Sequence, residues 1–293
     1  EKNTDLNILE VGLGGRLDAT NIANSILSII TSISFDHINH LGKRLTDIAK
    51  EKAGIIKEKV PIIVAPQKRQ VLEVIKKEAE KKSSNLLEFS KELKVKDISV
   101  FLEGISFEVI TKKNKYNIFT SHLGLYQIEN SSLAILGAET LSEILNFPLT
   151  PETVELGISS TEWLGRLKRY NLNGKDFYLD GAHNIGGILA LTKSLKRLKL
   201  NNLNIGFFAF KDKNPKKLLK KIVPFSKKIF IFSLKNERAF SYEEWEIICK
   251  KLGLKNYEIV KDEDIGRSIH KNNIQLYTGS LHFLGEVLRC LRK

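Results

Sequence analysis

The pattern of hydrophobic and polar positions predicts alternating strands and helices in the first half of the chain. Short apolar runs rich in β-branched residues predict buried strands at residues 7–13, 25–34, 60–66 and 85–90. Apolar residues at helical spacing predict helices at 45–56 and 70–82. Residues 98–122 contain runs of alternating apolar and polar positions that are separated by turn residues, which predicts β-hairpins. A long helix is predicted at 126–145, and another begins with Pro151 at its first position.

The second half repeats this alternation. The runs that predict strands are residues 176–181, 204–210, 228–234, 257–260 and 274–280. The stretches that predict helices are residues 186–198, 215–223, 241–252, 262–271 and 281–291. Strands that alternate with helices of this length predict βαβ units and a largely parallel sheet, so the fold class is α/β. We place a domain boundary near Trp163 to Leu167, which gives domains of residues 1–163 and 164–293.

Composition narrows the class of protein. The 293 residues are 42% hydrophobic, enough for two domains with ordinary cores. No apolar run approaches a membrane span, and the two cysteines, Cys249 and Cys290, favour a reducing, cytoplasmic setting without a cysteine metal cluster. The net charge of +13 comes from dispersed lysines without interleaved aromatic residues. We therefore expect no nucleic acid as a partner and attraction of an anionic small substrate. We also expect no membrane partner, and a monomer.

The stretch EVGLGGRLDATN, residues 10–21, places three glycines after a predicted strand. It lacks the last glycine of a dinucleotide fingerprint, and no GxxxxGK[ST] phosphate loop occurs in the chain. Glu10 falls inside an apolar strand, where a carboxylate is costly unless it is paired, bonded to backbone or bound to metal. Because ligands bind at the carboxyl ends of parallel strands, Glu10 is a candidate metal ligand.

Two further residues of this half are unusual. His37 and its neighbour Asp36 follow the next predicted strand, so His37 could share a divalent cation with Glu10, although Mg²⁺ prefers oxygen and a lone histidine here more often caps or hydrogen-bonds. Lys52 lies in the apolar stripe of its predicted helix with Ile48 and Ala49. Snorkelling is the common explanation, but burial would lower the pKa of Lys52 and allow CO₂ to carbamylate it.

In the second half, YLDGAHN places Asp180, His183 and Asn184 on the turn that leaves a strand. An acid and an imidazole there suit binding of a nucleotide, whereas the simpler interpretation is a polar turn in which Asn184 caps the next helix. Upstream, Arg166 in WLGRL could reach a phosphate or form a surface ion pair.

These segments together resemble the folylpolyglutamate synthase/dihydrofolate synthase family of the Mur ligases. The resemblance runs from about Leu6 to Leu284, in the family's order, through EVGLGGRLDATN, SFDHINHLG, IAKEKAGIIK, QIEN, WLGRL, LDGAHN, FKDKNP and TGSL. It implies a Mur-ligase-like central ATPase domain, residues 1–163, followed by a Rossmann-like C-terminal α/β domain, residues 164–293. It further implies an ATP-dependent ligase that adds L-glutamate to folate or dihydropteroate through an acyl phosphate.

The resemblance also assigns roles to matching residues. It implies that the ligands of Mg²⁺ are Glu10 and His37. It implies that the ATP contacts are Asn130, Arg166, Asp180 and His183. Lys52 matches a carbamylated lysine, and the catalytic set implied is Lys52, His183 and Arg166.

The chain also departs from the family's pattern. Ile185, Gly186, Phe35 and Glu237 stand where the family usually has other residues, and Glu237 weakens the match around Arg238. The family's Gly-Lys-Ser phosphate loop would lie upstream of Glu10 and is not in these residues. We expect the central domain to be incomplete at its N-terminus, and a protein that truly began at Glu1 to be inactive and unstable.

Three other interpretations stay open. Another Mur-type ligase could join an amino acid to a cell-wall precursor, although DATNI and QIEN favour the folate branch. A non-catalytic nucleotide-binding module is compatible with the missing phosphate loop. A dinucleotide oxidoreductase is disfavoured by the glycine spacing.

Overall fold

The computed structural model describes residues 4–172 and 174–291. The chain divides into two compact units, and each draws on three stretches of sequence. Unit 1 comprises Glu1–Lys96, Val109–Tyr116 and Glu129–Val154. Unit 2 comprises Asp97–Glu108, Asn117–Ile128 and Glu155–Lys293. Within the described residues no helix is long and apolar enough to cross a lipid bilayer.

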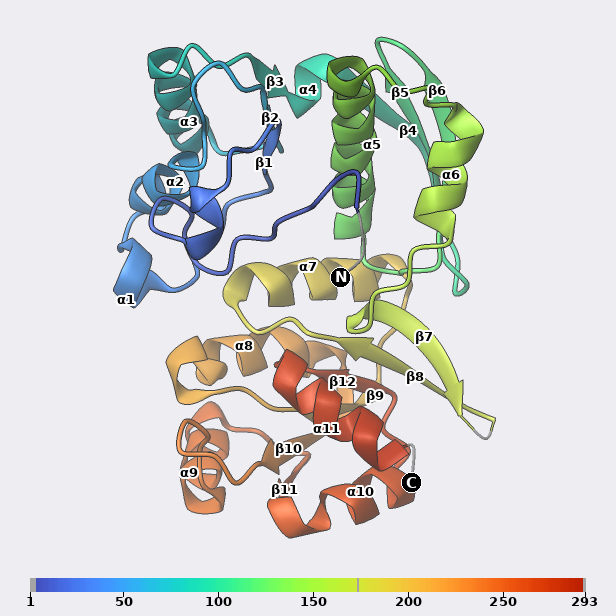
Figure 1. Cartoon of the computed structure of the whole chain (residues 1–293). Helices are drawn as coiled ribbons and strands as arrows, with labels where there is room; N and C mark the ends of the chain where they lie inside the picture. The colour runs from blue at the N-terminus through green and yellow to red at the C-terminus, as the bar shows by residue number, and fades with distance from the viewer. Residues whose placement is uncertain (1–3, 173, 292–293) are drawn as a thin grey trace. The chain divides into compact units, whose positions relative to one another are not determined.

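Unit 1 is built around a parallel three-stranded sheet in the order β1-β2-β3 (Figure 1). Its strands are β1 (Ser28–Ile30), β2 (Ile62–Val64) and β3 (Leu86–Glu88). The helices between them are α1 (Ile38–Leu41), α2 (Leu45–Ala53) and α3 (Arg69–Lys81), and α4 (Phe89–Glu92) follows. Helix α3 buries Val71, Ile75 and Ala79, which recur at helical spacing, and the exposed face between them is polar.

A second three-stranded sheet has the order β4-β5-β6. Its strands are β4 (Leu93–Val100), β5 (Ile105–Thr111) and β6 (Lys115–Thr120), joined by the short turns that the sequence predicts. Strand β6 buries every second residue, the alternation expected of a sheet with one covered face. Helices α5 (Tyr126–Leu145) and α6 (Pro151–Ser159) follow.

Unit 2 contains a six-stranded sheet in the order β11-β10-β9-β12-β8-β7. The strands are β7 (Arg166–Leu172), β8 (Lys175–Asp180), β9 (Leu203–Phe207), β10 (Ser226–Ser233), β11 (Tyr257–Lys261) and β12 (Leu276–Thr278). All neighbouring pairs are parallel except β7 and β8, which form an antiparallel hairpin. The sequence predicts the five parallel strands but not β7.

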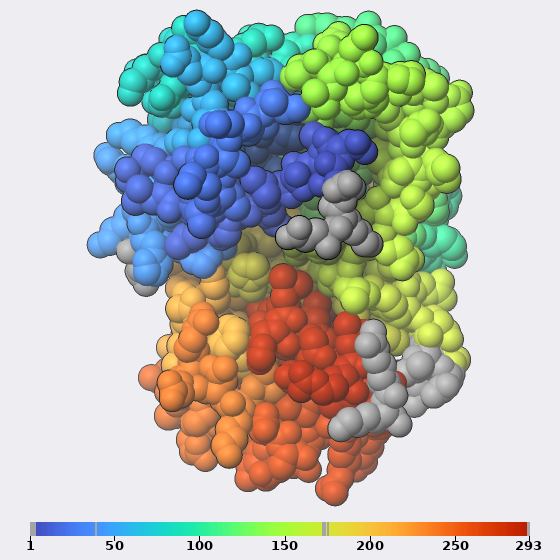
Figure 2. Space-filling view, viewed as in Figure 1, coloured from blue at the N-terminus to red at the C-terminus, as the bar shows by residue number. Residues whose placement is uncertain are grey.

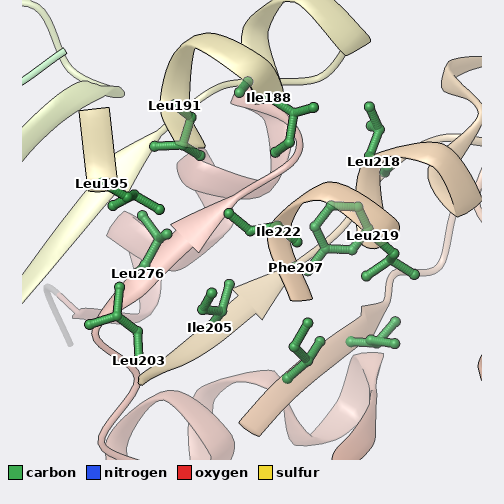
Figure 3. Close-up of a cluster of buried hydrophobic side chains, with 14 of the residues drawn as sticks. Ile188, Leu191, Leu195, Leu203, Ile205, Phe207, Leu218, Leu219, Ile222 and Leu276 are labelled. Carbon is green, nitrogen blue, oxygen red and sulfur yellow. The ribbon is translucent and has the colours of Figure 1, made fainter. Parts of the chain in front are cut away.

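Helices cover both faces of the sheet in unit 2 (Figure 1). The helices are α7 (Ile185–Arg197), α8 (Pro215–Ile222), α9 (Tyr242–Leu252), α10 (Ile265–Lys271) and α11 (Leu281–Leu291). One core packs α7, α8 and α9 against the sheet and is drawn in Figure 3; the other packs α10 and α11 against the opposite face. The apolar run of β10 serves both cores, because Ile229 and Ile231 enter the first while Phe230 and Phe232 enter the second.

The prediction of a strand at residues 7–13 is wrong. These residues are irregular, and Ile8 and Leu9 are 91% and 56% exposed. The stretch lies at the surface in the space-filling view (Figure 2). A buried strand needs a paired neighbour and apolar cover, and the described sheet of β1, β2 and β3 includes no ladder to this segment. β-branched composition alone therefore does not produce the strand.

Candidate functional site

At the ends of β8 and β12, the helices that follow the strands switch from one face of the sheet of unit 2 to the other. These neighbouring parallel strands pair with Asp180 opposite Thr278, the last residue of each. The chain then leaves β8 into α7 on one face and leaves β12 into α11 on the other face. A crevice opens at such a switch point, and it is where ligands bind in open α/β sheets. The fold therefore places Asp180 at the expected binding position.

Asp180 is a buried carboxylate, only 2% exposed, with a fixed set of donors. Its Oδ2 accepts a hydrogen bond from the Tyr126 hydroxyl at 2.9 Å, and its Oδ1 accepts one from the Ala182 N–H at 2.9 Å. Burial raises the pKa of Asp180 to about 6, and the bonds from Tyr126 and Ala182, with the charges of Arg166 and His183, act in the opposite direction. A carboxylate held in this way can accept a hydrogen bond from a hydroxyl or an amine of a ligand.

Arg166 and His183 lie beside this carboxylate. Arg166 begins β7 and pairs in register with Asp180 across the hairpin. The His183 Nδ1 lies 2.9 Å from the carbonyl oxygen of Gly181, which acts as the acceptor when Nδ1 carries the proton. The structure thus brings Arg166, selected from the segment WLGRL, beside Asp180 and His183, which were selected together from YLDGAHN. A guanidinium and an imidazole at this position suit an anionic ligand.

Asn184 has the capping role that the simpler interpretation gave it. Its side chain accepts a hydrogen bond from the Gly187 N–H at 2.7 Å at the start of α7. This cap fixes where α7 begins and therefore where the turn that carries His183 lies. The N-terminus of α7 also adds positive potential at the end of β8.

Tyr126 is the site residue that sequence reasoning missed. It begins α5, just before the QIEN segment, and its hydroxyl donates a hydrogen bond to Asp180 Oδ2. No signal in the sequence identifies it, because an aromatic residue at the start of a helix is ordinary. In the structure, a Cβ atom on Gly124 would lie 2.5 Å from Cζ of the Tyr126 ring. A glycine required by a neighbouring ring indicates that the ring is held in place.

The glycine segment of unit 1 passes close to the end of α2. The Arg16 N–H donates to the Glu51 carbonyl oxygen at 2.8 Å, and a Cβ on Gly15 would lie 2.9 Å from the same oxygen. Asp18 caps a short 3₁₀ helix and accepts from the Leu13 N–H at 2.8 Å. The glycines therefore allow a close backbone approach, and they form no phosphate cradle with a lysine.

Two placements made from the sequence need correction. Glu10 is exposed and lies outside any strand, so burial gives it no need of a metal. Strand β1 ends at Ile30, so Asp36 and His37 lie in the following loop rather than at the strand end. In that loop the Asp36 carboxylate accepts the His37 N–H at 2.8 Å. His37 precedes α1 with a left-handed φ of 47°.

Lys52 sits as its helical spacing predicts. Helix α2 buries Leu45, Ile48 and Ala49 on the stripe that Lys52 shares, and Lys52 itself is half-buried. Burial lowers the pKa of the Lys52 amine, and the charge of Asp36 partly offsets this effect. The amine is therefore easier to deprotonate than a solvated lysine.

The remaining predicted residue of unit 1 is Asn130, exposed in the first turn of α5. Within residues 4–172 and 174–291, no group of three or more His, Cys, Asp or Glu side chains is arranged to hold a metal ion. Glu10, His37, Lys52 and Asn130 belong to unit 1, and Arg166, Asp180 and His183 to unit 2. That all seven residues gather around one ligand stays a prediction.

Comparisons with known proteins identify the family. The Mur ligase middle domain matches residues 1–138. The dihydrofolate synthase/folylpolyglutamate synthase of Bacillus subtilis is 33% identical over 294 residues, which cover 98% of this chain and 68% of that protein. The chain belongs to the dihydrofolate synthase/folylpolyglutamate synthase family. The folylpolyglutamate synthase of Lacticaseibacillus casei is 30% identical over 215 residues, or 72% of this chain and 50% of that protein.

Solved structures of folylpolyglutamate synthases have the same fold. The enzyme of Thermotoga maritima matches with a TM-score of 0.80 at 31% identity, over 97% of this chain and 64% of that one. A Mycobacterium tuberculosis folylpolyglutamate synthase, solved with ADP and AMPPCP, matches with a TM-score of 0.84 at 24% identity, over 97% of this chain and 67% of that one. This chain thus spans between half and about two thirds of these family members.

Proposed function

We propose that this protein is an ATP-dependent ligase that joins the amino group of L-glutamate to a carboxylate of folate or dihydropteroate. The observation that carries the proposal is the group of Asp180, Arg166 and His183 at the switch point of unit 2, in a chain of the dihydrofolate synthase/folylpolyglutamate synthase family. A buried carboxylate beside a guanidinium and an imidazole suits a ligand that carries both hydroxyls and phosphates, as a nucleotide does.

The proposed reaction has two steps. A carboxylate oxygen of the pterin substrate attacks the γ-phosphorus of ATP, so that an acyl phosphate forms and ADP leaves with the oxygen that bridged the β- and γ-phosphates. The neutral amine of glutamate then attacks the acyl carbon, the C–N bond forms, and phosphate leaves. The proton of the amine passes to solvent or to a basic side chain. Catalysis in both steps rests on position and on compensation of charge.

Unit 2 supplies groups for the nucleotide in this proposal. Arg166 and His183 offset negative charge on the phosphates, and Asp180 accepts a hydrogen bond from a hydroxyl of ATP. Asn130 contributes a further contact to ATP from α5. The support for these roles is the geometry around Asp180 and the match to the family's motifs.

Unit 1 supplies groups for a cation. We propose Glu10 and His37 as ligands of Mg²⁺, which would offset negative charge on the triphosphate. Their donor set fits, because Mg²⁺ takes most of its ligands from phosphate and water and needs only one or two carboxylates. Lys52 is proposed to react with CO₂ through its neutral amine, and the lowered pKa of Lys52 supports this.

Further parts of the proposal concern the whole molecule. We propose domains of residues 1–163 and 164–293, a monomer, and a cytoplasmic enzyme. The two free cysteines support the cytoplasmic setting.

An assay of ADP release tests the proposed function. The protein is given ATP, Mg²⁺ and L-glutamate, with tetrahydrofolate, dihydropteroate or a muramyl precursor as the acceptor. Release that needs both glutamate and a pterin acceptor, with a product heavier by one glutamyl residue, supports the proposal. Release only with the muramyl acceptor, or release with a pterin acceptor that does not need glutamate, overturns it.

A further inference from the structure

The segment Leu123–Tyr126, called the strap here, connects β6 to α5 within unit 2 and is hydrogen-bonded to both β7 and α7. The Leu123 N–H donates to the carbonyl oxygen of Leu167 at 2.7 Å. The Leu125 N–H donates to the Ser194 Oγ of α7 at 3.0 Å. Ser194 is fully buried and donates in turn to the Ala190 carbonyl at 3.0 Å. The strap is therefore held by both β7 and α7 before α5 begins.

The strap fixes the ring of Tyr126. Gly124 has no room for a side chain, because a Cβ atom would lie 2.6 Å from Cε1 and 2.9 Å from the hydroxyl oxygen of Tyr126. The ring thus lies on the strap's own backbone. Because the backbone is anchored and the ring packs against it, the hydroxyl is held within hydrogen-bond distance of the Oδ2 atom of Asp180.

The two carboxylate oxygens of Asp180 have different donors. The Ala182 N–H, which belongs to the same turn as Asp180, bonds Oδ1, whereas Tyr126 bonds Oδ2 from another part of the sequence. Two donors on different oxygens restrict the rotation of a carboxylate. The charges of Arg166 and His183 also act on Asp180 and favour its ionised form. Attraction between charges has little directional preference, whereas the hydrogen bond from Tyr126 favours one position of the Oδ2 atom.

We propose that Tyr126 is a positioning residue, whose hydroxyl holds the Asp180 carboxylate in the orientation that receives the nucleotide. The inference rests on the proposed function for the identity of the ligand, but the hold on Asp180 is independent of it. A phenol suits this task because it donates one directed hydrogen bond and, unlike a cation, leaves the charge of the carboxylate available to the ligand.

The variant Tyr126→Phe tests the inference, because it keeps the ring on Gly124 and removes only the hydroxyl. We expect roughly tenfold weaker binding of AMPPCP with Mg²⁺, measured by titration calorimetry, since the Asp180 carboxylate is no longer held in one orientation before the nucleotide binds. We also expect the pKa of Asp180, followed by ¹³C NMR of its carboxyl carbon, to rise above that of the unchanged protein. Removal of a donor to the charged form favours the neutral form.

Tyr170→Phe is the matched control. Its hydroxyl is buried and has no hydrogen-bond partner among the described residues, so its removal is expected to change neither AMPPCP binding nor the pKa of Asp180. Asp180→Asn separates the two proposals. If Asp180→Asn loses AMPPCP binding and Tyr126→Phe does not, the positioning role is overturned. If the unchanged protein binds no AMPPCP but the pKa of Asp180 rises in Tyr126→Phe, the hold on Asp180 stands and the proposed function fails.

Discussion

Asp180 and Thr278 lie opposite each other as the last paired residues of β8 and β12. Both side chains project toward the core of α7, α8 and α9, because Tyr178 and Leu276, two residues earlier on each strand, belong to that core. Asp180 has hydrogen-bond donors on both oxygens, whereas the buried Thr278 hydroxyl has no partner among the described residues. The pair places one costly charge and one unpaired hydroxyl at the switch point of the sheet. Such costs are typical of binding sites rather than of cores.

Asp180→Asn is expected to stabilise the protein at neutral pH. Burial raises the pKa of Asp180 from 3.8 to about 6, so its stabilising contribution is complete below pH 3.8 and is lost as the pH rises through 6. The corresponding cost of the charged form is about 3 kcal/mol, at 1.36 kcal/mol per pKa unit. Urea unfolding at pH 8 should therefore show a larger free energy of unfolding for the variant.

The difference between this variant and the unchanged protein should shrink as the pH falls from 8 toward 5. A variant that is less stable at pH 8 would mean that Arg166 and His183 more than offset the cost of burial.

Thr278→Val should raise stability by about 1 kcal/mol, because it replaces a buried, unpaired hydroxyl by a methyl group of similar size. Thr120→Val is the matched control. Thr120 is also buried, but its Oγ1 bonds the Nδ1 of His122 at 3.2 Å and the N–H of His122 at 3.3 Å, so its loss should destabilise. Thermal unfolding checks both, and opposite signs are required.

Glu139→Ala is expected to destabilise unit 1 by roughly 2 to 4 kcal/mol, because it leaves the buried Tyr116 hydroxyl without its acceptor. The hydroxyls of Tyr116 and Thr111 both donate to Glu139 Oε1 at 2.7 Å. Glu143, on the same helix, has a side chain 67% exposed and pairs with Lys113 at 2.6 Å, so Glu143→Ala should change the free energy of unfolding by at most about 0.5 kcal/mol. Equal losses for the two variants in chemical denaturation would contradict this assignment.

Two glycines should respond in opposite directions to alanine. Gly279 has a φ of +108°, and a Cβ there would lie 2.0 Å from the Phe208 carbonyl oxygen, so Gly279→Ala should cost more than about 3 kcal/mol. Gly157 lies within α6, and a Cβ atom there would have no neighbour within 4 Å, so Gly157→Ala should stabilise by about 0.5 to 1 kcal/mol. Differential scanning calorimetry of the two variants would measure both shifts.

Lys52 should react with cyanate faster than Lys50, which is exposed on the same helix. Cyanate modifies neutral amines, and the pKa of Lys52 is lowered by burial, so more of its amine is neutral at pH 8. Peptide mass spectrometry over a time course gives the two rates. Faster modification of Lys50 would show that restricted access outweighs the shift in pKa.

The sequence predicts unit 2 better than unit 1 for a physical reason. Strands such as β9 and β10 are buried on both faces, so their runs of apolar residues are long and distinctive. Helix α9 carries its own start signal, a capping box of Ser241 and Glu244. By contrast, residues 7–13 have the composition of a strand, yet a strand exists only where a neighbour pairs with it.

The residues of the candidate site also differ in whether the sequence could identify them. Asp180, His183, Arg166 and Lys52 could be selected from the sequence because a polar residue after an apolar strand, or within an apolar helical stripe, conflicts with its surroundings. Tyr126 carries no such conflict, since an aromatic residue at the start of a helix is ordinary.

Local patterns in the chain were enough to establish the α/β class, the succession of the five parallel strands and their helices along unit 2, and the residues whose chemistry is out of place. Three facts needed the folded molecule: Asp180 faces Thr278 at a switch point, Tyr126 reaches Asp180, and Glu10 is exposed. A local pattern reports the burial that each residue prefers. Which distant residues meet depends on strand pairing and on the anchoring of segments such as the strap, which no local pattern encodes.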